Sequence, residues 1–184
     1  NKCPVLYLAL ESPDGFILRM KAYKLLNGAA SLSSVHAWFN RFSFSNLSDI
    51  SQLIDHINGG GFNGGIIFID TLARAMSGWD ENSATDMGKM IEACGMITER
   101  TNCAIVLVAH AGKNQQAGLR GHSSLHGAVD SSIEVRSSGK ERKLVFDKIK
   151  EGSDGMEYPF TLNIVTLGTS EDGQPITSCC VEYL

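Results

Sequence analysis

Three polar side chains each follow directly after an apolar run, and together they could perform chemistry. They are Glu11 after 5–10, Asp70 after 65–69, and His110 after 104–109. Uninterrupted apolar runs of this length are typical of strands buried on both faces of a parallel sheet. Ligands of open α/β sheets bind beyond the carboxyl ends of the strands, so the three side chains are expected to share one site.

Asp70 has the clearest chemical context of the three. It follows Ile66-Ile67-Phe68-Ile69, and four apolar residues followed by an aspartate form the Walker B pattern. A carboxylate in that position holds magnesium, directly or through water, beside the phosphates of a nucleotide. The pattern is short and common, and the alternative is that Asp70 caps the turn that begins at Thr71.

Glu11 and His110 would complement such a carboxylate. Glu11 would be the general base for the water that attacks a γ-phosphate, and His110 would sense that phosphate. Each also has a simpler interpretation. Glu11 precedes Ser12-Pro13-Asp14, which predicts a helix start whose dipole stabilises an acid. A single histidine after a strand is usually structural, so the conjunction of the three residues is what favours a site.

The elements between these residues predict an α/β fold. Apolar residues at helical spacing predict helices over 13–27, 48–57 and 83–101, and Ser83 with Asp86 forms a capping box. Buried strands separated by helices favour a parallel sheet. Four further strands joined by short polar turns predict an antiparallel extension of that sheet. They span 131–135, 143–148, 158–165 and 178–183.

The composition fits a single globular domain over residues 1–184. The chain has 184 residues, 43% of them hydrophobic, and a formal net charge of -4. This charge does not indicate general affinity for nucleic acid, although a basic patch facing a channel remains compatible with it. No apolar run approaches the roughly 20 residues of a membrane helix. The lack of such a run predicts no membrane partner. The five cysteines lack zinc-site spacing, and a reducing cytoplasm fits them best.

Taken in order, several short segments resemble the RecA-type ATPases, most closely the RepA-like hexameric replicative helicases of plasmids and phages, with DnaB- and KaiC-type proteins as wider relatives. The segments are LYLALE at 6–11, IFIDTLAR at 67–74, DEN at 80–82 with DMG at 86–88, VAHAGK at 108–113, and LRGHSS at 119–124 with GAVD at 127–130. The resemblance implies a mostly parallel RecA-like sheet flanked by helices, with C-terminal antiparallel strands. It also implies an ATP- and magnesium-dependent ring motor, a homo-hexamer that acts on single-stranded DNA.

The resemblance assigns roles to the residues already named. Glu11 matches the catalytic glutamate and Asp70 the magnesium-holding Walker B aspartate. His110 matches the sensor position, where relatives often carry glutamine. Arg120 matches an arginine near the DNA-facing side of the ring, and Lys113 is a second candidate for contacting DNA.

Two lysines near the end of the sequence match a further feature of the family. Lys148 and Lys150 correspond to a Lys-x-Arg pair that reaches the nucleotide of the neighbouring subunit. The second position is lysine here, which supplies charge but not the planar fork of arginine. The alternative is that both are alternate residues on one solvated face of a strand.

The sequence lacks the Walker A pattern G-x-x-x-x-G-K-[ST]. Its pairs Gly112-Lys113 and Gly139-Lys140 have neither the upstream glycine nor the following hydroxyl residue. In the family this loop precedes the strand that ends at Glu11. We therefore expect an N-terminally truncated core that is inactive by itself and self-associates through open sheet edges.

Other functions remain compatible with the sequence. One is a non-catalytic RecA-fold module for assembly or DNA binding, and another is a RecA-like recombinase or clock-type ATPase. The presence of both Glu11 and Asp70 favours the ATPase, because a scaffold has no need of that pair.

Overall fold

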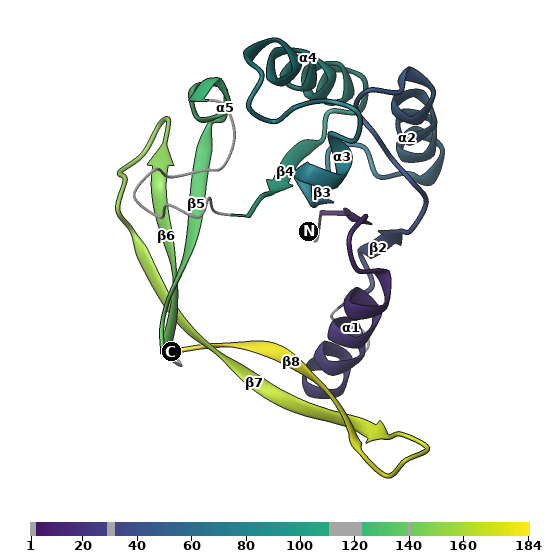
Figure 1. Ribbon diagram of the computed structural model, residues 1–184, viewed down its shortest axis with the longest axis vertical. Coiled ribbons are helices and arrows are strands. Elements are labelled where there is room, and N and C mark those ends of the chain that lie inside the picture. Colours follow the sequence, from purple (N-terminus) through teal and green to yellow (C-terminus); the bar gives the residue numbers. More distant parts are fainter. Residues whose placement is uncertain (1–2, 29–31, 111–122, 140) are drawn as a thin grey trace. The chain divides into compact units, whose positions relative to one another are not determined.

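The computed structural model describes residues 3–28, 32–110, 123–139 and 141–184 (Figure 1). The chain forms two compact units. The first contains Asn1–Pro13 and Leu32–Ala128, and the second contains Asp14–Ser31 and Val129–Leu184. Within the described ranges, no helix combines the length and the apolar composition needed to cross a bilayer.

The first unit contains a four-stranded parallel sheet. Its strands are β1 (Val5–Ala9), β2 (Val35–Trp38), β3 (Ile66–Asp70) and β4 (Ala104–Val108), in the order β2-β1-β3-β4. The three strands expected from apolar runs are confirmed. Strand β2 was not expected, because its sequence Val-His-Ala-Trp is short and has no uninterrupted apolar run.

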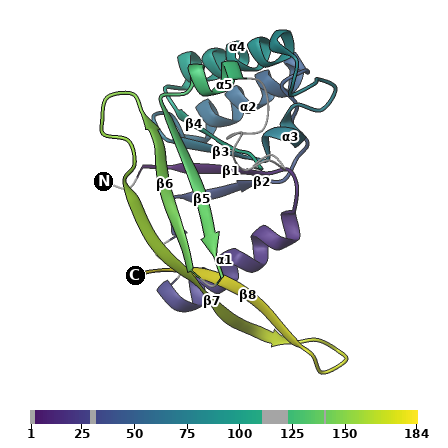
Figure 2. The same cartoon turned by 60° about the vertical axis from the view of Figure 1, so that its left-hand side comes forward.

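Helices α2 (Leu47–Gly60) and α4 (Ala84–Thr101) cover one face of this sheet, as Figure 2 shows. Two shorter helices, α3 (Leu72–Ala75) and α5 (Ser123–Ala128), complete the unit. Leu6, Leu8, Ile67 and Ile69 alternate along β1 and β3, and all four are almost wholly buried. This alternation is expected for strands with one face against helices, since successive side chains point to opposite faces.

The ends of the two long helices follow from their capping residues. Ser83 accepts a hydrogen bond from the Asp86 amide at 3.3 Å, which confirms half of the predicted capping box. Helix α2 continues through Gly59 and Gly60, whereas the sequence predicted an end at 57. It ends at Gly60, and the cap residue Gly61 has a φ of 73°, in the left-handed region that glycine adopts without strain.

The second unit pairs α1 (Pro13–Asn27) with an antiparallel sheet. The strands β5 (Ser131–Ser138), β6 (Glu141–Ile149), β7 (Glu157–Thr169) and β8 (Pro175–Tyr183) lie in sequence order. Ala22 of α1 packs with Val165 and Cys180, flanked by Tyr23 and Leu167. The antiparallel pairing was predicted correctly, but the expected extension of the parallel sheet is not observed. Among the described strands these four form a separate sheet, because consecutive hairpins satisfy each other's backbone groups.

Candidate functional site

The register of the parallel sheet places the three predicted residues at one edge. Ala9 is the partner of Asp70, and Asp70 is the partner of Val108, so the strands β1, β3 and β4 end at the same level. The Leu10 amide donates to the Asp70 carbonyl at 2.7 Å, which continues this alignment. Glu11 lies two residues after Ala9, and His110 lies two residues after Val108. The two residues therefore flank the end of β3, where Asp70 lies.

Glu11 and His110 approach each other across the end of β3. The distance between His110 Nε2 and Glu11 Oε2 is 3.4 Å. The two side chains are exposed to 66% for His110 and 40% for Glu11, so water screens their attraction and the contact is weak. The arrangement leaves both groups accessible to a ligand at this edge.

Thr71 is a further member of this cluster. Its hydroxyl beside Glu11 is the main cause that holds the pKa of that carboxyl below its ordinary value of 4.5, and His110 is a second cause. The Thr71 hydroxyl oxygen is buried. Among the described residues, no partner satisfies both the distance and the angle of a hydrogen bond to it. Glu11 is 40% exposed, so its contact with the Thr71 hydroxyl is weak.

Asp70 is oriented by an aromatic neighbour on the adjacent strand. The Tyr7 hydroxyl donates a hydrogen bond to Asp70 Oδ2. The Tyr7 ring stacks on Phe68 with 5.8 Å between ring centroids, which limits its movement. The N-cap position of α3 belongs to Thr71, so the structure does not support the interpretation of Asp70 as the cap of that turn.

The oxygen atoms at this edge fit a magnesium–nucleotide complex. Asp70 and Glu11 supply carboxylates, and Thr71 supplies a buried hydroxyl beside Glu11. Magnesium prefers oxygen ligands and is usually held by one or two carboxylates, together with water and substrate phosphates. Nowhere in the described parts of the chain do three histidine, cysteine or acidic residues gather around one point, and this mode of binding does not require three.

Two of the four basic residues singled out in the sequence, Lys148 and Lys150, are described, and both belong to the second unit. Lys148 Nζ donates to the Val129 carbonyl at 2.7 Å, and Lys150 Nζ pairs with Asp130 Oδ1 at 2.9 Å. The hydrogen bond from Asp130 raises the pKa of Lys150, and Lys150 in turn lowers the pKa of Asp130. Both lysines thus contact the segment just before β5. Lys113 and Arg120 lie outside the described residues.

Two participants were not predicted from the sequence, Tyr7 and Thr71. Tyr7 lies within an apolar run, where its ring appears to be one more core residue. The two-residue period of a strand could have indicated its role. Tyr7 and Ala9 lie on the same face of β1, and Ala9 is the register partner of Asp70. The sequence indicates only that Thr71 begins a turn. Nothing in it indicates that the Thr71 hydroxyl faces Glu11.

The arrangement of strands and helices defines the class of fold, which is RecA-like. A crystal structure of the RadB recombinase matches with a TM-score of 0.56 and 11% sequence identity, covering 88% of this chain and 76% of that chain. At that identity the likeness establishes the fold alone. No curated protein matches the chain. The family model described as an AAA domain matches residues 1–116, well over half of the sequence, and the chain belongs to this AAA domain family.

Proposed function

We propose that the protein is an ATP-hydrolysing ring motor of the kind that unwinds DNA during plasmid and phage replication. One observation carries the proposal: Glu11 and His110 meet at 3.4 Å beyond the Walker B strand, with Thr71 beside the glutamate. A purely structural edge would not need an exposed carboxylate in contact with residues that follow two other strands, β3 and β4. The AAA domain family and the RecA-like fold support ATP as the substrate.

Each residue at the edge takes a specific role in this proposal. Glu11 orients the attacking water and accepts its proton as the γ-phosphate bond breaks, and with a pKa below 4.5 it is ionised at neutral pH. Asp70, held by Tyr7, would bind magnesium beside the phosphates. When bound, the metal neutralises charge on the phosphates. His110 connects the position of the γ-phosphate to Glu11.

The proposed assembly is a homo-hexameric ring around single-stranded DNA. Lys148 and Lys150 would reach the nucleotide of the neighbouring subunit, and Arg120 and Lys113 would face the DNA. The present partners of the two lysines are a main-chain carbonyl and the exposed Asp130. The Lys150 pair is exposed and worth little, so a triphosphate would compete with it readily, whereas the Lys148 contact is half-buried.

The test is magnesium-dependent ATP hydrolysis by the full-length protein, with and without single-stranded DNA. Glu11→Gln should lower kcat by roughly 10²–10⁴, the usual contribution of a general base, while nucleotide binding persists. The matched control is Glu99→Gln, which makes the same change at an exposed position on α4 and should leave the rate unchanged. A folded wild type that neither hydrolyses ATP nor is stabilised by it would instead support the non-catalytic assembly module.

A further inference from the structure

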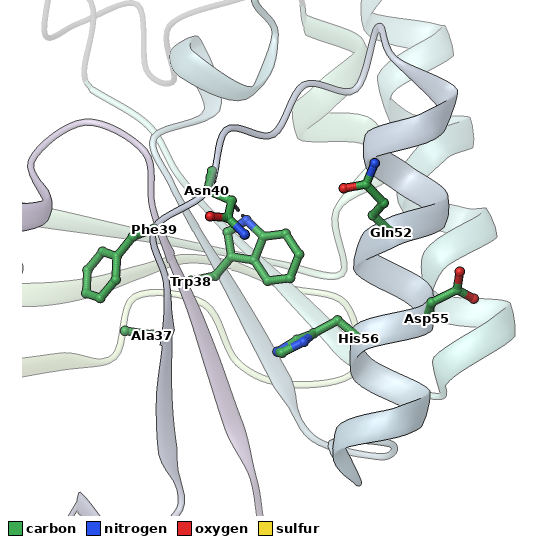
Figure 3. Close-up of a pocket in the computed structure, with 7 residues that line it drawn as sticks. All are labelled: Ala37, Trp38, Phe39, Asn40, Gln52, Asp55 and His56. Carbon is green, nitrogen blue, oxygen red and sulfur yellow. Dashed lines mark hydrogen bonds between the residues drawn. The ribbon is translucent and has the colours of Figure 1, made fainter.

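A second concave site lies in the first unit, between the end of β2 and helix α2 (Figure 3). Its volume is about 530 Å³, within the range of small-molecule sites. Strand β2 is an outer strand of the parallel sheet, which leaves this flank open. The residues that matter for its chemistry are Trp38, Asn40, Gln52, Asp55 and His56.

Two aromatic rings form a rigid corner in this cleft. The ring centroids of Trp38 and His56 lie 4.9 Å apart, and the angle between the ring planes is 72°. His56 is held from behind by Phe62, on which it stacks at 5.6 Å and 27°. The indole N–H of Trp38 donates to the Asn40 carbonyl at 3.1 Å, which fixes the ring. The corner is therefore formed before any ligand arrives.

The local sequence explains why these groups converge. Trp38 pairs with Leu8 across the sheet, so it lies on the face that α2 covers. On α2, Gln52 and His56 are four residues apart and share one side of the helix. Gln52 Nε2 donates to Ser48 Oγ at 3.2 Å, which positions its amide.

The polar groups around the corner are amides rather than charges. Asn40 lies beside the indole and the Gln52 amide oxygen faces the cleft, whereas the Asp55 carboxylate and Phe39 point away (Figure 3). Each amide offers both donors and an acceptor. Such groups recognise the edge of a planar heterocycle, as asparagine and glutamine do when they bind bases in pairs of hydrogen bonds. No lysine or arginine is among the described residues that line the cleft, so nothing there favours a phosphate.

We propose that this cleft binds a nucleobase, stacked on Trp38 and hydrogen-bonded along its edge by Asn40 and Gln52. His56 forms the wall perpendicular to the stacked base. Every base has a flat π-face, so aromatic stacking accepts many bases, while the amides select among them. The base can belong to a free nucleoside or nucleotide or to a single strand. Arg41 follows Asn40 directly and is exposed, so it is available to a phosphate outside the cleft.

The chain offers a direct optical probe, since Trp38 and Trp79 are its two tryptophans. In a Trp79→Phe protein the emission comes from Trp38. Titration with adenosine, guanosine, cytidine and thymidine should give saturable quenching of Trp38 with at least one of them, and ribose should give none. The reverse variant, Trp38→Phe, should show no quenching from Trp79.

Two amide variants test the hydrogen bonds without disturbing the corner. Asn40→Ala retains the main-chain carbonyl that binds the indole, and Gln52→Ala changes an exposed position. Each should weaken nucleoside binding at least fivefold, whereas Ser51→Ala, a neighbouring exposed position on α2, should not. Circular dichroism would establish that all variants remain folded.

The source of the base is resolved by comparing thymidine with oligothymidylate. Much tighter binding of the oligonucleotide, lost in Arg41→Ala, would identify a single strand, and equal affinities would identify a free nucleoside. Absence of quenching by every nucleoside and by the oligonucleotide would overturn the proposal, as would quenching that both amide variants leave unchanged. Binding should persist in Glu11→Gln, so this proposal and the proposed ATPase can fail independently.

Discussion

At the scale of single residues, the ionisation of Glu11 depends on its neighbours rather than on burial. Thr71 first and His110 second hold its pKa below 4.5. A carboxyl whose pKa is lower in the folded state stabilises the fold above the unfolded-state pKa, and this stabilisation is lost as pH falls through the folded-state pKa. Glu11 is therefore ionised across the neutral range, and its protonation should limit activity only below about pH 4.5.

Replacing Thr71 by valine should raise the pKa of Glu11 towards 4.5, because the main hydrogen-bond donor is removed. His110→Ala should raise it by less. The measurement is a titration of the Glu11 side-chain carboxyl by carbon-13 NMR. An unchanged pKa in the valine variant would show that the hydroxyl does not act on this carboxylate.

The same substitution should change stability by no more than about 1 kcal/mol in either direction, because losing the contact with Glu11 and removing a buried polar group oppose each other. The Thr71 hydroxyl is buried without a partner of full geometry, and valine has nearly the same shape without that polar group. The free energy of unfolding in urea is the measurement. A loss clearly greater than about 1 kcal/mol would mean that the hydroxyl is well hydrogen-bonded in solution.

How far the sequence predicts the site depends on where each residue lies in its strand. Glu11, Asp70 and His110 stand at strand ends, where a parallel register brings them to one edge, and the structure does so. The strand period indicates the face on which Tyr7 lies, but the atomic contacts of Tyr7 and Thr71 depend on tertiary geometry that the sequence does not show. The catalytic roles of all these residues remain predictions.

At the scale of elements, two glycines respond oppositely to the same change. A methyl group at Gly65, just before β3, would lie 2.3 Å from the Pro4 carbonyl oxygen and 2.8 Å from that of Phe62. Gly88, within α4, has open space around it. Gly65→Ala should destabilise by about 3 kcal/mol, and Gly88→Ala should stabilise by about 0.5–1 kcal/mol. Thermal or urea unfolding measures both, and equal effects would contradict the described backbone approach.

The elements that could be predicted are those with long or strongly apolar patterns. The helices α1, α2 and α4 and the strands β1, β3 and β4 meet that condition. Strand β2 does not, because its four residues become a strand only by pairing with β1. The antiparallel strands were predicted, but not that they form a sheet of their own. A strand pattern indicates that a segment is a strand, and it does not indicate which sheet the strand joins.

At the scale of the whole molecule, the second unit has its own core, which can be weakened selectively. Ala22 is fully buried against Val165 and Cys180. Ala22→Leu should overpack this core at a cost of about 1–3 kcal/mol. Hydrogen exchange measured by mass spectrometry should then show faster exchange in α1, β7 and β8, with little change in β1, β3 and α4. A uniform increase would show that both units open together.

The position of α1 also has a consequence for synthesis on the ribosome. Ala22 emerges 143 residues before Val165, its partner in the core. At about 5–20 residues per second, that interval lasts roughly 7–30 seconds. During this time the helix has no native surface to cover its apolar side, while the strands on either side of it can already begin to pair. The nascent chain therefore exposes α1 to chaperones for longer than any neighbouring segment of the parallel sheet.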